Sequence, residues 1–154
     1  MRPQEPIRQG GIRRARAQEA DGIADLWLAS RHAAAGIPPS AHSDDDVRVW
    51  LRELLIPSCE VWVATECDVA VGMLALKAQW VEQLYVAPGS QRRGHGSRLL
   101  AAAQGSRASL ELWTFESNLG ARRFYEAHGF RWEGTSSSDN EERAPALLYR
   151  WSAG

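Results

Sequence analysis

At 154 residues, the chain has the length of one compact domain, and its 44% of hydrophobic residues can form a substantial core. Eighteen basic residues against nineteen acidic ones give a net charge of −1, which argues against a dedicated nucleic-acid-binding protein. No apolar run approaches the roughly 18 residues of a membrane span, so we expect no membrane partner. Two cysteines, Cys59 and Cys67, make neither a disulfide framework nor a zinc site. We therefore expect no metal, and a reducing cytoplasm is the simplest setting.

The first elements in chain order are a tail, a strand and a helix. Residues 1–11 are polar and rich in Pro and Gly, which predicts a flexible tail before a single domain over residues 12–154. Residues 12–18 alternate Arg with smaller residues, a pattern typical of a strand with one solvated face. Asp21 then begins an amphipathic helix that runs to about His32.

A second helix is predicted after a loop that contains two prolines and a glycine. Ser43 and the acidic run at residues 44–46 favour a helix N-terminus there, because anions stabilise that end of a helix. Its apolar stripe includes Leu54, and we expect Pro57 to end it. The remaining strands are predicted at 60–65, 69–77, 80–86, 109–115, 130–133 and 146–151, with helices at 97–107 and 118–128. Gly129 is well placed just after the second of these helices.

The sharpest chemical feature is the loop between the strand at 80–86 and the following helix. It reads Gln91-Arg92-Arg93-Gly94-His95-Gly96-Ser97. Glycines let the backbone approach a ligand, and the helix N-terminus offers free N–H groups to a phosphate. The loop matches neither a P-loop nor a Rossmann fingerprint. From the spacing alone, a phosphate site and a plain strand-to-helix turn with a solvated basic face are equally supported.

Two motifs together resemble the GNAT superfamily of N-acetyltransferases. Leu84-Tyr85-Val86 stands before the loop at Gln91–Gly96, as in the Q/R-x-x-G-x-G/A motif of that family. Asn118 and the run Ala121–Phe130 resemble its N-x-x-A-x-x-F-Y-x-x-x-G-F segment. The resemblance extends over residues 12–151 and is closest to small bacterial members with unassigned substrates. It implies an α/β (α+β) fold whose mixed, mostly antiparallel sheet of six to seven strands is flanked by about four helices.

The resemblance also implies a site for acetyl-CoA. The loop backbone and the helix N-terminus would bind the pyrophosphate, Gln91 would shape the turn, and the strand backbone at 84–86 would pair with pantetheine. Asn118 and Tyr125 are seven residues apart, so they share one helix face with Ala121 and Arg122. The residues implied in cofactor binding are Leu84, Tyr85, Val86, Gln91, Arg92, Arg93, Gly94, His95, Gly96, Ser97, Asn118, Ala121, Arg122 and Tyr125.

By the same resemblance, Tyr125 would protonate the departing thiolate and the Val86 N–H would stabilise the oxyanion. A phenol with a pKa near 10 is a suitable acid toward a thiolate of comparable basicity. Glu82, two residues before Leu84, would be the base that takes a proton from the amine. An ordinary solvated strand residue is an equally good reading of Glu82.

Residues on the acceptor side are predicted less directly. His42 and Glu141 lie on loops expected to reach the acceptor, although a lone histidine is more often structural. Trp80, beside Glu82 at the start of its strand, could line the acceptor pocket, and core or rim packing is an equally good interpretation. The other tryptophans on apolar faces are expected in the core; they are Trp27, Trp50, Trp62, Trp113 and Trp151.

The predicted function is acetyl transfer from acetyl-CoA to a primary amine of a small molecule or a peptide. A non-catalytic acyl-CoA-binding or sensing domain is the alternative, and a nucleotide binder using the same loop is disfavoured by the second motif. The sequence does not identify the amine and leaves the oligomeric state open, although many relatives are homodimers.

Overall fold

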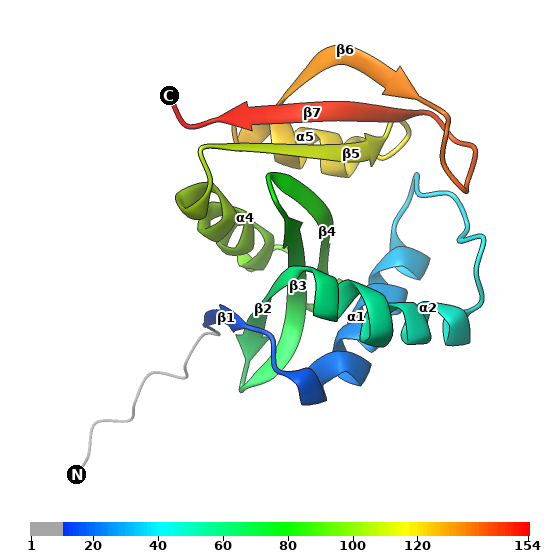
Figure 1. Ribbon diagram of the computed structural model, residues 1–154, viewed down its shortest axis with the longest axis vertical. Helices are drawn as coiled ribbons and strands as arrows, with labels where there is room; N and C mark the ends of the chain where they lie inside the picture. Colours follow the sequence, from blue (N-terminus) through cyan, green and yellow to red (C-terminus); the bar gives the residue numbers. More distant parts are fainter. Residues whose placement is uncertain (1–10) are drawn as a thin grey trace.

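The sheet of this protein has seven strands. In the computed structural model, which describes residues 11–154, they are β1 (Ile12–Arg14), β2 (Glu60–Glu66), β3 (Val69–Lys77), β4 (Trp80–Val86), β5 (Ser109–Phe115), β6 (Arg131–Ser137) and β7 (Ala146–Ser152). Their order is β1-β2-β3-β4-β5-β7-β6, and only the β4–β5 neighbours are parallel. The mixed, mostly antiparallel sheet predicted from the sequence is therefore confirmed (Figure 1).

Four helical segments flank the sheet. They are α1 (Ala20–Ala33), a continuous segment of α2 (Asp44–Trp50), a π-helical turn η2 (Leu51–Leu55) and α3 (Ile56–Ser58), then α4 (His95–Ser106) and α5 (Leu119–Ala127). Two short 3-10 turns, η1 (Ala17–Glu19) and η3 (Pro88–Ser90), precede α1 and follow β4. As predicted, the hydroxyl of Ser43 caps α2 by accepting a hydrogen bond from the Asp46 N–H at 3.2 Å.

The two faces of the sheet bury two separate cores, and strand β3 shows why. Met73 and Ala75 pack with α1 and the α2 segment, whereas Leu74 and Leu76 pack with α4 and α5. This alternation follows from the two-residue period of a strand, and a strand covered on both faces is apolar on both. In the ribbon view, α1 and α2 lie to one side of β3 and β4, with α4 on the other (Figure 1).

Several boundaries differ from the sequence expectation. The first strand ends at Arg14, because the chain turns into η1 before α1 begins at Ala20. Pro57 lies inside the last helical turn, and the helix ends one residue later at Ser58. Strand β6 continues to Ser137 across an irregularity at Gly134, whose φ is +86°.

Two predicted core residues are exposed. Trp113 is 45% exposed because Leu110, Leu112 and Thr114 take the buried face of β5, which turns the tryptophan to the other face. Leu54 is 62% exposed: the π-helical turn buries Leu51 and Leu55, and its wider spacing rotates Leu54 outward.

The predicted tail falls largely outside the described residues. Only Gly11 is described, and its carbonyl accepts a hydrogen bond from the Thr65 N–H at 3.0 Å beside β1. Among the described residues, no helix combines the length and apolar character needed to cross a membrane.

The feature that positions the site is the separation of β4 from β5. The two parallel strands are in register only at Trp80 and Glu111, where the Glu111 N–H donates to the Gln79 carbonyl at 2.9 Å. Beyond that point they diverge, so the edge of β4 from Val81 to Val86 faces a gap that β5 does not fill.

Candidate active site

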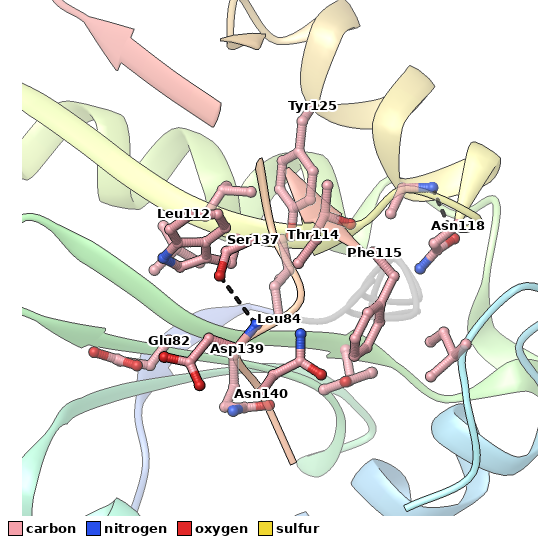
Figure 2. Close-up of a pocket in the computed structure, with 17 residues that line it drawn as sticks. Glu82, Leu84, Leu112, Thr114, Phe115, Asn118, Tyr125, Ser137, Asp139 and Asn140 are labelled. Carbon is pink, nitrogen blue, oxygen red and sulfur yellow. Dashed lines mark hydrogen bonds between the residues drawn. The ribbon is translucent and has the colours of Figure 1, made fainter. Parts of the chain in front are cut away.

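A cavity of about 500 Å³ occupies the space between the diverging strands; we name it the splay cavity. Residues of β4, β5 and α5 form most of its walls, and the β6–β7 loop and Ile37 of the α1–α2 loop complete them (Figure 2). Of the residues predicted from the sequence, it brings together Glu82, Leu84, Tyr85, Asn118, Ala121 and Tyr125. The sequence did not indicate the contribution of Asp139 and Asn140 from the β6–β7 loop.

Tyr125 extends from α5 toward the middle of the splay cavity (Figure 2). Its ring is held edge-on between Phe124 and Phe130, at centroid distances of 5.3 and 5.6 Å. The side chain is 9% exposed, and no hydrogen bond joins its hydroxyl to another described residue. Burial raises the pKa of this phenol well above its usual value. Tyr125 is therefore a protonated acid that faces the cavity.

Glu82 lies across the splay cavity from Tyr125, on β4 (Figure 2). Its neighbours Val81 and Gln83 pair with Leu76 and Ala75, so Glu82 is the extra residue of a β-bulge. A bulge re-aims a side chain relative to the regular alternation of its strand. The carboxylate is exposed, and none of the ion pairs within residues 11–154 includes it. It is thus available to accept a proton.

The loop before α4 has the backbone of an anion site. Gly94 is the N-cap of α4 with a φ of +80°, and Arg92 also has a positive φ of +65°. Alternating signs of φ turn successive N–H groups toward one side, and the helix N-terminus adds its own free N–H groups. The side-chain amide of Gln91 donates to the Val86 carbonyl at 3.3 Å and ties the loop to the end of β4. Such a loop fits a phosphate or pyrophosphate.

Gly96 has a different role from Gly94. A Cβ atom added at Gly96 would lie 3.4 Å from Cζ of Phe124 and 3.7 Å from the Val86 side chain. The small residue thus lets the first turn of α4 pack closely against α5 and the end of β4. Ser97, one residue on, hydrogen-bonds His128 across the same helix contact at 3.1 Å.

His95, which the resemblance implied in cofactor binding, is buried in a cluster of polar side chains. It is the first residue of α4, 3% exposed, and its Nε2 contacts the Glu66 carboxylate at 2.7 Å. Its Nδ1 faces the guanidinium of Arg98 at 2.8 Å, so Nδ1 accepts and Nε2–H donates. Arg93 also donates to Glu66, at 2.9 and 3.0 Å. The hydrogen bonds from His95 and then Arg93 lower the pKa of Glu66.

The contacts of Glu66 and His95 reduce the net positive charge of the loop. Arg93 and Arg98 are engaged with protein groups, since Arg98 also donates to the Arg93 carbonyl at 3.2 Å. The cationic excess read from the sequence is therefore partly neutralised by Glu66. A bound anion would be held mainly by backbone N–H groups.

The residues of α5 that were predicted to share one ligand-binding face do not all border the splay cavity. The side chain of Asn118 caps the helix by accepting from the Ala121 N–H at 3.2 Å, and both residues border the splay cavity. Arg122 lies apart from the cavity lining, because it donates to the Tyr149 hydroxyl at 3.3 Å and to the Glu116 carbonyl at 3.0 Å.

A second cavity of about 500 Å³ adjoins the splay cavity, and we name it the tryptophan cavity. His42 and Glu141, predicted on the acceptor side, both line it and pair with each other. Gln83 borders both cavities. Trp80 lines neither cavity and sits at the β4–β5 contact instead.

Sequence reasoning missed Arg31 and Glu142, which join α1 to the β6–β7 loop through an ion pair of 2.7 Å. The Ser30 hydroxyl, also unremarked in the sequence, donates to the Val86 carbonyl at 2.8 Å. Within residues 11–154, no three His, Cys, Asp or Glu side chains converge as a metal site would require.

Comparisons with known proteins agree with this geometry. A family model described as an acetyltransferase (GNAT) domain matches residues 57–132. The peptidyl-lysine N-acetyltransferase YiaC of Escherichia coli is 26% identical over 91% of this chain and 95% of its own length.

Solved structures share the whole fold. YjaB of Escherichia coli, in its apo form, has a TM-score of 0.77 at 27% identity over 94% of this chain and 99% of its own. The yncA protein of Salmonella typhimurium, solved with acetyl-CoA, has a TM-score of 0.70 at 17% identity over 94% of each chain. The chain therefore belongs to the GNAT family of acetyltransferases, which confirms the N-acetyltransferase predicted from its two sequence motifs.

Proposed function

We propose that this protein transfers an acetyl group from acetyl-CoA to a primary amine by direct attack on the thioester. The observation that carries the proposal is that both the buried Tyr125 side chain and the exposed Glu82 side chain line the splay cavity. One can give a proton and the other can take one, which are the two proton transfers that aminolysis of a thioester needs.

In this proposal, acetyl-CoA would extend from the loop before α4 along β4 to the splay cavity. The loop at residues 92–97 and the N-terminus of α4 would bind the pyrophosphate through backbone N–H groups. The unpaired edge of β4 would hold the pantetheine, which leads the thioester into the splay cavity. The yncA protein, which shares the fold, was solved with acetyl-CoA, and this supports the choice of co-substrate.

Each residue then has one task. Glu82, directly or through a water molecule, takes a proton from the incoming ammonium and frees its lone pair. The Val86 N–H, at the end of β4, stabilises the negative charge that develops on the carbonyl oxygen. Tyr125 gives its proton to the sulfur as the carbon–sulfur bond breaks, and its buried surroundings favour the neutral phenol until that moment.

The test is a thiol-release assay with acetyl-CoA and a panel of amines, comparing wild type with Tyr125→Phe. Loss of the acid should lower kcat about 100-fold, within the range typical of general acid catalysis. Binding of CoA, measured by calorimetry, should stay within about threefold of wild type, because the ring packing survives.

Two results would contradict the proposal in different ways. Unchanged turnover in Tyr125→Phe would remove Tyr125 as the acid. Tight acetyl-CoA binding by the wild type, with no thiol release for any amine, would instead support the non-catalytic acyl-CoA-binding domain. A melting temperature that acetyl-CoA leaves unchanged would exclude both.

A further inference from the structure

The tryptophan cavity has a chemistry that the proposed reaction does not use. It lies between α1, α2 and the β6–β7 loop, and it touches the splay cavity at Gln83. The β6–β7 loop serves both cavities, with Asp139 and Asn140 on the splay side and Glu141 and Glu142 on this side. A molecule whose amine lies in the splay cavity could therefore extend a second group into the tryptophan cavity.

Two fixed indole rings form one wall of this cavity. Trp27 and Trp50 meet edge to face, with their centroids 6.0 Å apart. Trp27 is almost fully buried, and its Nε1–H donates to the side-chain oxygen of Gln83 at 3.0 Å. Ring faces of tryptophan attract cations. The Arg31 guanidinium already lies over the Trp27 ring, so the half-buried Trp50 is the ring that remains for a ligand cation.

The charged side chains around the cavity are predominantly acidic. Arg31 is the one arginine or lysine of the lining, and Glu142 pairs with it at 2.7 Å while its guanidinium stacks 5.3 Å from the Trp27 ring. Within residues 11–154, the one ion pair of Glu141 is with His42, which carries charge only when protonated. Asp46, on the first turn of α2, appears in none of the ion pairs among the described residues. With His42 neutral, the lining carries more negative than positive charge.

From this combination we infer that the tryptophan cavity binds a second cationic group of the acceptor, an ammonium or a guanidinium remote from the amine that is acetylated. The inference rests on the proposed acetyl transfer and names its substrate class. The acceptors are amines that carry a second cationic group, rather than a neutral or an anionic one. Indole faces and carboxylates together recognise a cation, whereas they would repel a carboxylate or a phosphate. Linear diamines and lysine peptides with a neighbouring basic residue both present this chemistry.

The experiment compares linear diamines of increasing length with monoamines in which a methyl group replaces the second ammonium. Specificity is the ratio of kcat/KM for a diamine to that for its matched monoamine, both measured by thiol release. We expect a ratio of about ten at the best length, from one cation–π contact and one partly exposed charge pair together. The ratio should fall as ionic strength rises, because salt screens such pairs.

Substitutions in the cavity lining test whether the tryptophan cavity causes the preference for diamines. Asp46→Asn and Glu141→Gln should each lower the ratio about threefold. Asp45→Asn is the matched control, because this neighbour also lies in the first turn of α2, is exposed, and lies outside the cavity lining. It removes the same charge and the same contribution to the helix end, so it should leave the ratio unchanged.

Three outcomes are decisive. A ratio near one for every diamine, with no gain for a lysine peptide with a neighbouring arginine over its alanine counterpart, would overturn the inference while leaving acetyl transfer intact. Equal effects of Asp46→Asn and Asp45→Asn would overturn it as well. A lysine peptide with a neighbouring arginine that gains over its alanine counterpart, with no gain among the diamines, would support the cation site with a peptide as its source. If no amine is acetylated, the proposed function fails. Calorimetry with each diamine of the series and CoA then still tests the cavity, and equal affinity in wild type and Asp46→Asn for every diamine would overturn the inference.

Discussion

Gly94 and Gly96 stand two residues apart in the anion loop, and their different surroundings predict different responses to alanine. Gly94 has a φ of +80°, where an alanine costs about 1–2 kcal/mol of backbone strain. Its Cβ would also meet the Arg98 guanidinium at 2.9 Å. A Cβ at Gly96 would instead make an ordinary contact of 3.4 Å with Phe124.

We therefore expect Gly94→Ala to weaken CoA binding about tenfold, because the strained loop relaxes away from the conformation that presents its N–H groups. Gly96→Ala is the control and should bind CoA almost as wild type does. Titration calorimetry with CoA measures both. Equal affinities for the two variants would show that the loop conformation at Gly94 does not set the anion site.

The burial of Tyr125 predicts how kcat depends on pH. Burial raises the pKa of its phenol, so the hydroxyl stays protonated beyond the pH of about 10 at which an ordinary tyrosine ionises. The acid form is thus present throughout the neutral and mildly alkaline range and would be lost only as pH rises through the elevated value. The kcat profile should show no decline from Tyr125 below about pH 10. A decline near pH 8 that disappears in Tyr125→Phe would contradict this.

At the scale of elements, Glu19 joins the first strand to α1. Its carboxylate accepts from the guanidinium of Arg13 at 2.6 and 2.8 Å and from the Arg16 N–H at 2.8 Å. The Arg13 hydrogen bond lowers the pKa of Glu19, so its stabilising effect is full above the unfolded pKa of about 4.3 and is lost as pH falls through the lowered folded value.

Glu19→Gln should accordingly lower the free energy of unfolding by about 1.5–3 kcal/mol at pH 7, the range for hydrogen bonds to charged groups. The difference from wild type should shrink as pH falls below about 4, where the wild-type carboxylate begins to protonate. Urea unfolding at several pH values measures it. A gap that stays constant down to pH 2.5 would contradict the charge-based explanation.

The loop between α1 and α2 packs closely against the turn between β5 and α5. Gly36 has a φ of +79°, and a Cβ there would lie only 2.2 Å from the Ser117 carbonyl oxygen. The Ser117 hydroxyl also donates to the Gly36 carbonyl. The next residue, Ile37, lines the splay cavity, so this contact fixes one wall of the site.

Gly36→Ala should therefore lower stability by about 1–3 kcal/mol and raise KM for acetyl-CoA, because the backbone must move away from Ser117. Gly22→Ala is a control of opposite sign. Gly22 is an exposed position of α1 with open space around it, so alanine should add about 0.5–1 kcal/mol. Thermal unfolding and thiol-release kinetics test the pair. A Gly36→Ala variant as stable as wild type would refute the close contact.

For the whole molecule, the local pattern of the sequence was enough to predict the seven strands and the helices around them. Periodicity located β3, β4 and β5 at their observed bounds, because short-range alternation decides which face of a strand is buried. Gly129 has the positive φ of +87° expected just after α5. Both motifs led to residues that now border one cavity.

The parts that the sequence did not predict depend on long-range contacts. His95 is buried against Glu66, 29 residues away, and Arg31 pairs with Glu142, 111 residues away. The bulge that carries Glu82 depends on how β4 pairs with β3. The tryptophan cavity exists only because the β6–β7 loop returns over α1 and α2. No local propensity carries such information.

The central claim is that the splay cavity and the loop before α4 together form the acyl-CoA site. A crystal structure of the protein with CoA tests it most directly. We predict pyrophosphate oxygens within hydrogen-bond distance of the N–H groups at residues 92–97, and the thiol sulfur in the splay cavity next to the Tyr125 hydroxyl. CoA bound elsewhere, or a sulfur that lies outside the splay cavity, would contradict the account.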